Sequence, residues 1–268
     1  MTVAPDILQL ASMLDDPDHK VAVNLLSRLL AREDELGPLP SLLQESADPL
    51  IRRRAHMLQN ALTMRRYRRE IGRVLNGDAG DYDLFDILIG IHMLWFDKDQ
   101  YQTLRNDVDH FLKKAQLFAL TSLDDAELFL RKHTFLPVAE TTIDPESYCI
   151  GTVLFHHSGA TGLLMLVICE LLDSPEFRLV KVMGEFGVMD SKGNILLGNG
   201  SWRLAKTDPA GVEYWSKSKM LKYITVTLLS CAVNSDSYRY VMSIAQTLTG
   251  DDSEDVMAGF PYPFAAGN

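Results

Sequence analysis

The segment "VLFHHSGATGLLMLVICELL", residues 153–172, contains three kinds of side chain that take part in enzyme chemistry. Two imidazoles, His156 and His157, come before a glycine-containing turn. The Thr161 hydroxyl lies at the start of the apolar stretch that follows, and the Cys169 thiol lies within that stretch. Imidazole is the commonest general acid and base, and hydroxyl and thiol groups act as nucleophiles when a base activates them. The segment is therefore the first candidate for an active site.

The spacing of these groups favours structural roles. Neighbouring helical residues point about 100° apart, so His156 and His157 are poorly placed to share a metal ion. We expect the pair to end a short helix, with Gly159 as the left-handed residue that follows it. Thr161 is expected to cap the next helix. Cys169 lies two turns into that helix, so we expect a buried and unreactive thiol.

The elements around this segment follow from apolar periodicity. Residues 84–95 and 101–112 predict two helices, in which His92 and His110 are expected to be packing residues, and another helix begins near residue 122. Residues 178–182 alternate as a strand does, and residues 190–194 predict a hairpin turn. Helix returns after residue 202. Helices before strands, without β-α-β crossovers, predict an α+β fold that is mostly helical with a small antiparallel sheet.

The first third of the chain contains an internal correspondence. Asp16-Pro17 and Asp48-Pro49 each precede an amphipathic helix, at an offset of 32 residues. Leucines at 26 and 30 recur at 58 and 62 with the same offset. Units of this kind bury their apolar stripes by stacking on one another. The pattern predicts a helical-repeat-like region, with a helix pair or bent helix interrupted at Asp16-Pro17.

An arginine-rich segment follows the second Asp-Pro pair. Residues 51–73 contain eight arginines, and residues 78–109 contain eight aspartates. Either the arginines form a basic surface for an acidic partner, or the two segments face each other in one domain. The candidate binding residues are Arg52, Arg53, Arg54, Arg65, Arg66 and Arg69.

Composition limits the functional classes. The chain has 268 residues, 47% hydrophobic content and a formal charge of −10, which disfavours nucleic acid as the default partner. Three scattered cysteines predict neither a disulfide framework nor a zinc site. The longest apolar run has seven residues, and the first residues lack the pattern of a secretory signal. We expect a cytoplasmic protein without membrane association, metal or cofactor.

Several motifs resemble those of the bacterial transglutaminase-like proteins of the SirB type. In that family a helical region precedes a block of the form Pro-x-Asn-Ser-Tyr-Leu-x-x-Val-Leu, then basic residues and a Gly-x-Pro that opens the central helix. A strand ending in Pro-Gly-His-Phe and a hairpin to an Asp- or Asn-Pro-Phe segment follow. Here "PESYCIGTVL" (residues 145–154), "HHSG" (156–159) and "MGEF" (183–186) are similar to these blocks in order and spacing, as is the helical stretch 83–112 before them.

The resemblance implies a core related to cysteine enzymes of the transglutaminase and papain-like fold. Those enzymes use a Cys at the start of the central helix, a His on the next strand, and an Asp or Asn that orients the His. In this chain the corresponding places hold Thr161, Glu185 and, in the third region, Asn199. A carboxylate is far less basic than a hydroxyl's conjugate base, so Glu185 is a poor base for Thr161.

The resulting hypothesis is a non-catalytic transglutaminase-like protein that binds a protein or a small ligand, through the residual cleft or the arginines. It has a helical repeat-like region at 1–78, a transglutaminase-like domain at 79–245 with a helical C-terminal extension, and an extended tail at 246–268. One alternative is an enzyme of altered, hydrolase-like chemistry that pairs Glu185 with His156 or His157. Another is nucleic-acid or acidic-partner binding through the arginine-rich helix.

Overall fold

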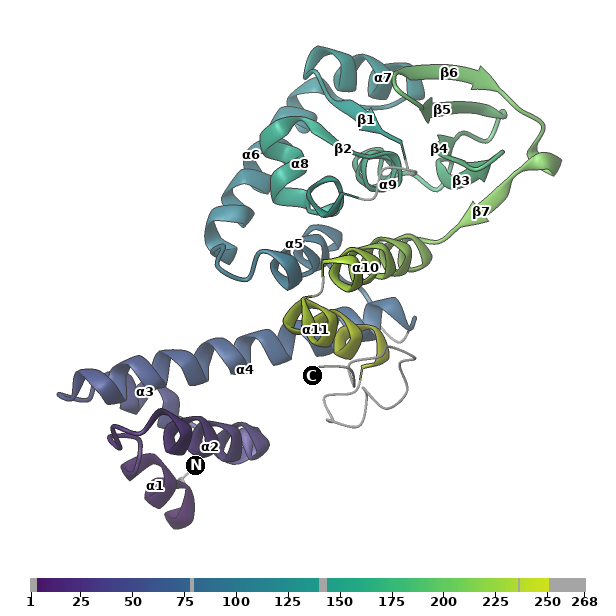
Figure 1. Ribbon diagram of the computed structural model, residues 1–268. Coiled ribbons are helices and arrows are strands. Elements are labelled where there is room, and N and C mark those ends of the chain that lie inside the picture. Colours follow the sequence, from purple (N-terminus) through teal and green to yellow (C-terminus); the bar gives the residue numbers. More distant parts are fainter. Residues whose placement is uncertain (1–3, 78–79, 140–143, 236, 251–268) are drawn as a thin grey trace. The chain divides into compact units, whose positions relative to one another are not determined.

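The computed structural model describes residues 4–77, 80–139, 144–235 and 237–250. The chain divides into two compact units, Met1–Tyr67 and Arg68–Asn268. The division lies inside one continuous helix, α4 (Pro49–Leu75), whereas the sequence predicts a boundary at residue 78 (Figure 1).

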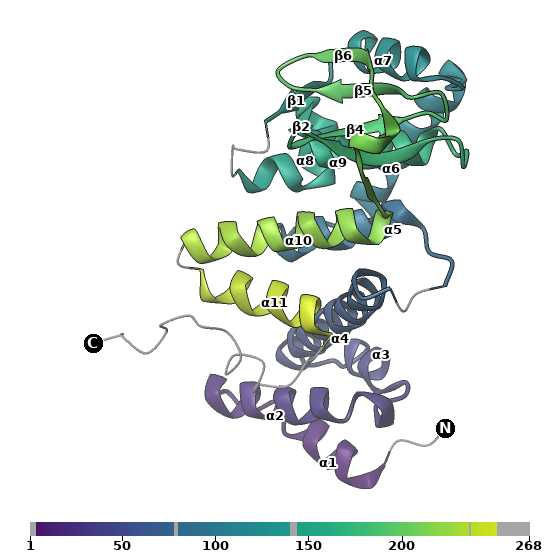
Figure 2. The same ribbon diagram turned by 90° about the vertical axis from the view of Figure 1, so that its right-hand side faces the viewer.

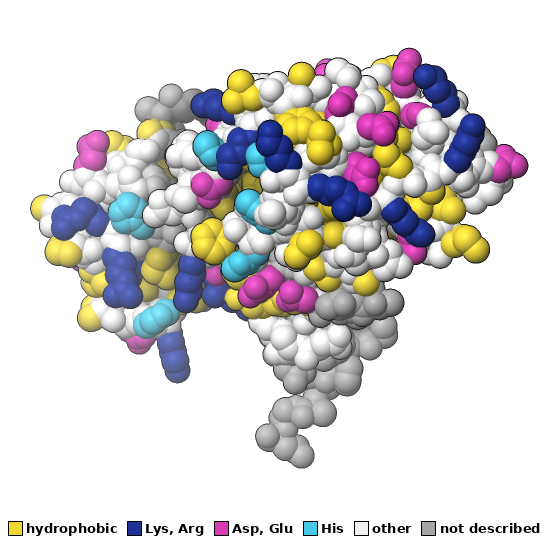
Figure 3. All heavy atoms as spheres, turned by 90° about the horizontal axis from the view of Figure 1, so that it is seen from above, with side chains coloured by type: hydrophobic (Ala, Val, Ile, Leu, Met, Phe, Trp, Pro, Cys, Tyr) yellow, Lys and Arg dark blue, Asp and Glu magenta, His cyan; other side chains and the backbone are white. Residues whose placement is uncertain are grey.

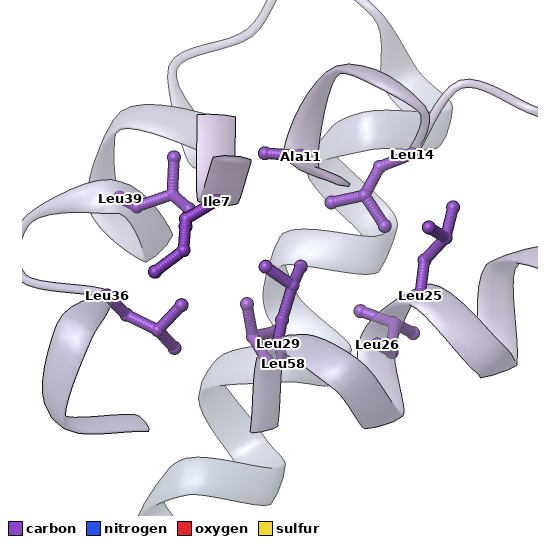
Figure 4. Packing of buried hydrophobic residues seen from close by; sticks show 9 residues of the cluster. All are labelled: Ile7, Ala11, Leu14, Leu25, Leu26, Leu29, Leu36, Leu39 and Leu58. Atoms are coloured by element: carbon purple, nitrogen blue, oxygen red, sulfur yellow. The ribbon is translucent and has the colours of Figure 1, made fainter. Parts of the chain in front are cut away.

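The first unit is a helical cluster. It contains α1 (Pro5–Ser12), α2 (His19–Ala31), a 3-10 turn (Glu33–Glu35), α3 (Leu39–Gln44) and the first part of α4. Prolines at the starts of α1 and α4 suit the first helical turn, where a backbone N–H has no partner to lose. The helix pair interrupted at Asp16-Pro17 is confirmed. Figure 4 shows the shared core, in which Leu26 and Leu58, the residues paired by the 32-residue offset, both lie.

The described helices of the second unit include one that is almost entirely buried. They are α5 (Leu84–Trp95), α6 (Tyr101–Phe118), α7 (Leu123–Lys132), α8 (Ile150–His156), α9 (Thr161–Leu171), α10 (Lys217–Asn234) and α11 (Tyr238–Thr249), with 3-10 turns at Pro145–Tyr148 and Pro209–Gly211. Side chains of Asp83, Ser122 and Ser216 accept hydrogen bonds from backbone N–H groups and cap α5, α7 and α10. Every residue of α9 from Thr161 to Cys169 is buried, so α9 is the central helix.

A five-stranded antiparallel sheet packs against α9. Its strands are β3 (Arg178–Val182), β4 (Glu185–Met189), β5 (Asn194–Gly198), β6 (Trp202–Lys206) and β7 (Glu213–Trp215), in the order β6-β5-β4-β3-β7. β1 (Leu136–Val138) and β2 (Ser158–Ala160) form a separate parallel pair. Figure 2 shows the sheet layered over α8 and α9, with α10 and α11 side by side below them. The predicted α+β class, mostly helical with a small antiparallel sheet, is confirmed.

Two local expectations need correction. His157, with φ of 53°, is the left-handed residue that ends α8, whereas Gly159 lies in β2. Glycine is required there for packing, because a Cβ would lie 2.7 Å from the Val153 methyl carbons. Thr161 is the first residue of α9 and its side chain does not cap the helix.

The hairpin turn at residues 190–194 is confirmed, with Gly193 at φ of 82°. Helix α11 continues to Thr249, and residues 251–268 of the predicted tail lie outside the described residues.

Candidate functional site

The Thr161 hydroxyl is buried and hydrogen-bonded. It lies 3.1 Å from the Val138 carbonyl oxygen and 2.9 Å from that of Gly198, and it can donate only to these groups. The residue is 2% exposed. These hydrogen bonds link the start of α9 to the ends of β1 and β5. Because the carbonyl oxygens hold the hydroxyl proton, it is not available to a base.

Glu185 is also fully engaged. Its Oε1 accepts from Asn199 Nδ2 at 2.8 Å, and its Oε2 accepts from Arg203 Nη2 at 2.6 Å. The bond from Asn199, together with the Arg203 guanidinium, lowers the pKa of Glu185 below its ordinary value. The carboxylate is thus a weaker base than an ordinary glutamate.

The two histidines of the opening segment point to other partners. The His157 ring stacks on Phe135, with centroids 4.9 Å apart and planes at 22°, and its Nδ1 lies 3.3 Å from Thr134 Oγ1. His156 is exposed and meets the Phe155 ring edge-on. Among the described residues, neither imidazole hydrogen-bonds to Glu185, whose two oxygens are occupied by Asn199 and Arg203.

The three thiols are buried and unpaired. Cys149, Cys169 and Cys231 form no disulfide, and burial raises the pKa of each. Cys169 lies among the apolar residues of α9, as expected. A buried neutral thiol is a poor nucleophile.

Three of the six candidate arginines are bonded to the protein's own backbone. Their guanidinium groups donate to carbonyl oxygens near the C-terminal ends of α1, α2 and α3. Arg54 donates to Leu14 and Asp16, Arg65 to Leu30, and Arg52 to Ser46 and Ala47. Arg54 is 6% exposed, whereas Arg53, Arg66 and Arg69 are exposed. Much of the basic segment therefore holds the first unit together.

The structure contains a second candidate site that was not predicted from the sequence. We call it the histidine pocket. It is a hollow of about 210 Å³ between one face of α6 and the C-terminal ends of α7 and α8. It is lined by Asp107, His110, Phe111, Lys114, Phe129, His133, Phe135, Gly151, Leu154, Phe155 and His157. Figure 3 shows histidine side chains gathered beside lysine or arginine side chains on the face seen from above in Figure 1.

Phenylalanine rings form the floor of the histidine pocket. Phe111 meets Phe129 and Phe135 edge-on, with centroids 5.8 Å apart in both pairs. Imidazoles lie on two of these rings: His133 contacts Phe129 at 4.6 Å between centroids, and His157 stacks on Phe135. All three phenyl rings are nearly completely buried, so the floor is rigid and apolar.

Hydrogen bonds fix the backbone around this floor. The Trp202 indole N–H donates to the Phe135 carbonyl at 2.7 Å, and the Leu136 N–H donates to the His157 carbonyl at 2.8 Å. Thr134 and His157 both have positive φ, 56° and 53°. For a β-branched residue such as Thr134 that conformation is rare and strained, and such strain gathers at functional sites.

Only some of the residues of this pocket could be grouped from the sequence. Asp107, His110 and Lys114 are spaced so that they share one face of α6, which periodicity can reveal. His110 was expected to be a packing residue, but it is exposed at the pocket. His133 and His157 come from two other segments, and only the packing of α7 and α8 brings them to α6.

His92, the other histidine expected to pack, is buried. It is 2% exposed, and its Nε2 lies 2.9 Å from Asp99 Oδ2. A Cβ on Gly151 would lie 2.8 Å from its Cε1, so the glycine backbone closes off that side of the ring. The expectation for His92 is confirmed.

In the part of the chain that the structure describes, no group of three or more His, Cys, Asp or Glu side chains is arranged to hold a metal ion. Within the same residues, every helix is too short or too polar to cross a bilayer. Comparison with protein-family models, curated proteins and solved structures finds no match for this chain.

Proposed function

We propose that this chain is a non-catalytic, transglutaminase-like protein of the cytoplasm that binds a small ligand in the histidine pocket without converting it. Its first unit would be a helical-repeat-like region. The proposal rests on three observations. The Thr161 hydroxyl is hydrogen-bonded to backbone carbonyls, the Glu185 carboxylate is bonded to Asn199 and Arg203, and a hollow is lined by polar groups without hydrogen bonds to the described residues.

The positions assigned by the resemblance lie close together, which supports the transglutaminase-like part of the proposal. Thr161, at the start of the central helix, donates to the Gly198 carbonyl. The next residue in the chain, Asn199, donates to Glu185 on the neighbouring strand. The places of the nucleophile, the base and the orienting group thus converge from α9, β4 and the end of β5.

The observation that carries the non-catalytic part is that both reactive groups are engaged. The Thr161 proton is held by backbone carbonyls, and Glu185 is held ionised by Asn199 and Arg203. General-base catalysis needs a base with a pKa near the operating pH and within hydrogen-bond reach of the nucleophile. Neither condition holds here.

The same contacts disfavour the two alternatives. A Glu185–histidine pair requires an imidazole within reach of the carboxylate, and among the described residues His157 contacts Thr134 and Phe135 while His156 contacts Phe155. Binding of an acidic partner would use the candidate arginines, and three of the six, Arg52, Arg54 and Arg65, bond to carbonyls instead, which reduces the basic surface to Arg53, Arg66 and Arg69.

Ligand-observed NMR with a mixed set of anionic, neutral and cationic fragments tests this function. Leu154→Trp fills the histidine pocket, and Leu128→Trp, at a 57% exposed position on α7, is the matched control. We expect the fragments that bind the wild type to lose binding in L154W, to keep it in L128W, and to be recovered chemically unchanged. Fragments that are cleaved or modified in a Thr161-dependent way would contradict the proposal. Binding that survives in a folded L154W would contradict it as well.

A further inference from the structure

We infer that the ligand of the histidine pocket is a single-ring aromatic, or similarly flat apolar, molecule that carries a carboxylate or phosphate group. This inference rests on the proposed binding function and adds the chemical class of the ligand. The apolar floor and the polar rim of the pocket specify the two parts separately.

The floor and the volume specify the apolar part. Phe111, 8% exposed, lies at the base of the hollow against the more deeply buried Phe129 and Phe135, with Leu154 beside it. The hollow of about 210 Å³ compares with roughly 150 Å³ for a cavity that admits benzene. There is room for one six-membered ring and a small head group. Phe155 is 80% exposed beside the hollow and adds apolar surface at its edge.

The polar side chains at the rim of the pocket indicate the charge of the ligand. His110, Lys114 and His133 line the hollow, and their side chains have no hydrogen bond or ion pair with any described residue. An ammonium has three donors, and an imidazole has one donor when neutral and two when protonated. Unbonded donors from two helices that face one small hollow call for an acceptor with several oxygens. A carboxylate or a phosphate meets this need with charge-assisted hydrogen bonds.

His157 adds a ring nitrogen whose direction is fixed. The Thr134 hydroxyl lies 2.8 Å from the His133 carbonyl oxygen, to which it can only donate, so it accepts from His157 Nδ1–H at 3.3 Å. This arrangement leaves His157 Nε2 for a ligand, as an acceptor when the ring is neutral and as a donor to an anion when the ring is protonated. The left-handed backbone at 157 and the stacking on Phe135 hold the ring in that orientation before a ligand arrives.

The surroundings of the rim favour an anion over a cation. Burial, and then the charges of Lys114, Lys132 and His157, lower the pKa of His133. A cationic ligand would add to this repulsion. Asp107 is the one carboxylate that lines the described pocket, and it also lines the adjoining hollow that contains Lys98. An anion bonded to His133 would make protonation of that ring more favourable.

Calorimetry with matched probes tests the inference on the full chain at about pH 6.5, the ordinary imidazole pKa. Benzoate and phenyl phosphate carry both features, benzyl alcohol lacks the charge, benzylamine reverses it, and inorganic phosphate lacks the ring. We expect benzoate or phenyl phosphate to bind and to shift the NMR signals of the pocket histidines, and the other three probes to bind at least roughly tenfold more weakly.

Neighbouring lysines on α6 provide the matched variants. Lys114→Met should weaken benzoate or phenyl phosphate binding roughly tenfold, because it removes one charge-assisted donor. Lys113→Met, which removes an exposed charge outside the pocket, should change it less than twofold. At the left-handed position, His157→Asn keeps a residue that tolerates that backbone while removing the ring nitrogen, and should also weaken binding.

Two different failures are distinguishable. Benzyl alcohol binding as tightly as benzoate, or inorganic phosphate as tightly as phenyl phosphate, would overturn the ligand class and leave the binding function standing. Equal loss of affinity in Lys113→Met and Lys114→Met would also overturn the class, since the charge would then act at long range. If no fragment of any charge binds in a way that L154W abolishes, the proposed function itself is wrong.

Discussion

Two histidines on neighbouring helices differ in burial and therefore in role. His92 is enclosed by the Gly151 backbone and bonded to Asp99, whereas His110 lies exposed at the rim of the pocket. The Nδ1 of His92 is buried and has no hydrogen-bond partner within the described residues. An imidazole in this setting stays neutral, because a proton on Nδ1 would put an unbonded charge in an apolar environment.

The state of His92 makes stability depend on pH. Burial lowers the pKa of His92 below its model-peptide value of 6.5, although Asp99 works in the opposite direction. Between the folded and unfolded pKa values the unfolded chain binds more protons, so stability rises with pH in that window and falls as acid is added below about 6.5. We expect the free energy of unfolding, from urea titrations followed by circular dichroism, to fall as the pH is lowered through that window.

Replacement of the imidazole is the control for this pH dependence. His92→Gln removes the titrating ring and should flatten the pH profile just below about 6.5. Carboxylates with lowered pKa values, such as Glu185, lose their contribution only at lower pH, below about 4.5. An unchanged slope in His92→Gln would show that another group governs the profile.

Which single residues are buried could be predicted from sequence better than what they contact. The apolar neighbours of Cys169 predict its burial correctly. The partner of the Thr161 hydroxyl could not be predicted, because Gly198 lies 37 residues away and reaches it only through the sheet. Helical capping, the local alternative, was the reasonable expectation and is wrong at this position.

At the scale of elements, arginines of α4 donate hydrogen bonds to carbonyl groups at the ends of three other helices. The last four carbonyl groups of a helix have no partner within it. Arg54, Arg65 and Arg52 supply donors to carbonyls at or just beyond the ends of α1, α2 and α3, respectively. A guanidinium is suited to this because it has five donors in a fixed plane. The arginine content of this helix is thus explained in part by the short helices packed around it.

Adjacent arginines allow a direct test of this role. Arg54→Ala removes bonds to two carbonyls at a buried position and should lower the free energy of unfolding of the first unit by about 2 kcal/mol. Arg53→Ala, at the exposed neighbouring position, should change it by less than about 0.5 kcal/mol. Thermal unfolding of both variants measures the difference, and equal effects would contradict the role assigned to Arg54.

Long elements were predicted well and short ones were not. The helices at 84–95 and 101–112 and the strand at 178–182 follow from several repeats of an apolar pattern. Strands β1, β2 and β7 have three residues each, too few for periodicity to register. The histidine pocket depends on where three helices meet, and no local pattern contains that information.

At the scale of the whole molecule, each unit has its own core. In the first unit, nine buried residues from α1 to α4 form one cluster (Figure 4). The second unit is built around α9, whose buried residues pack on the sheet. A boundary inside one helix is invisible to composition, because the helix pattern continues across residues 67 and 68 without a linker.

Separate cores predict separate responses to mutation. Leu29 is fully buried in the first cluster, and Leu29→Ala should cost that unit about 2–5 kcal/mol of stability. Thermal melts should show helical signal lost at a lower temperature, while the NMR signals of His133 and His157 stay unchanged at ambient temperature. Shifts of those two histidine signals in L29A would show that the units do not respond independently.

The stacked imidazole on the floor of the pocket also has a spectroscopic consequence. Protons held above the face of a phenyl ring are shielded by its ring current, and the His157 ring lies nearly parallel to Phe135 at 4.9 Å. Its resonances should therefore appear upfield of those of the exposed His110 and His156. The protein thus contains an intrinsic reporter beside the site, which reads out any ligand that moves the ring, without a label attached.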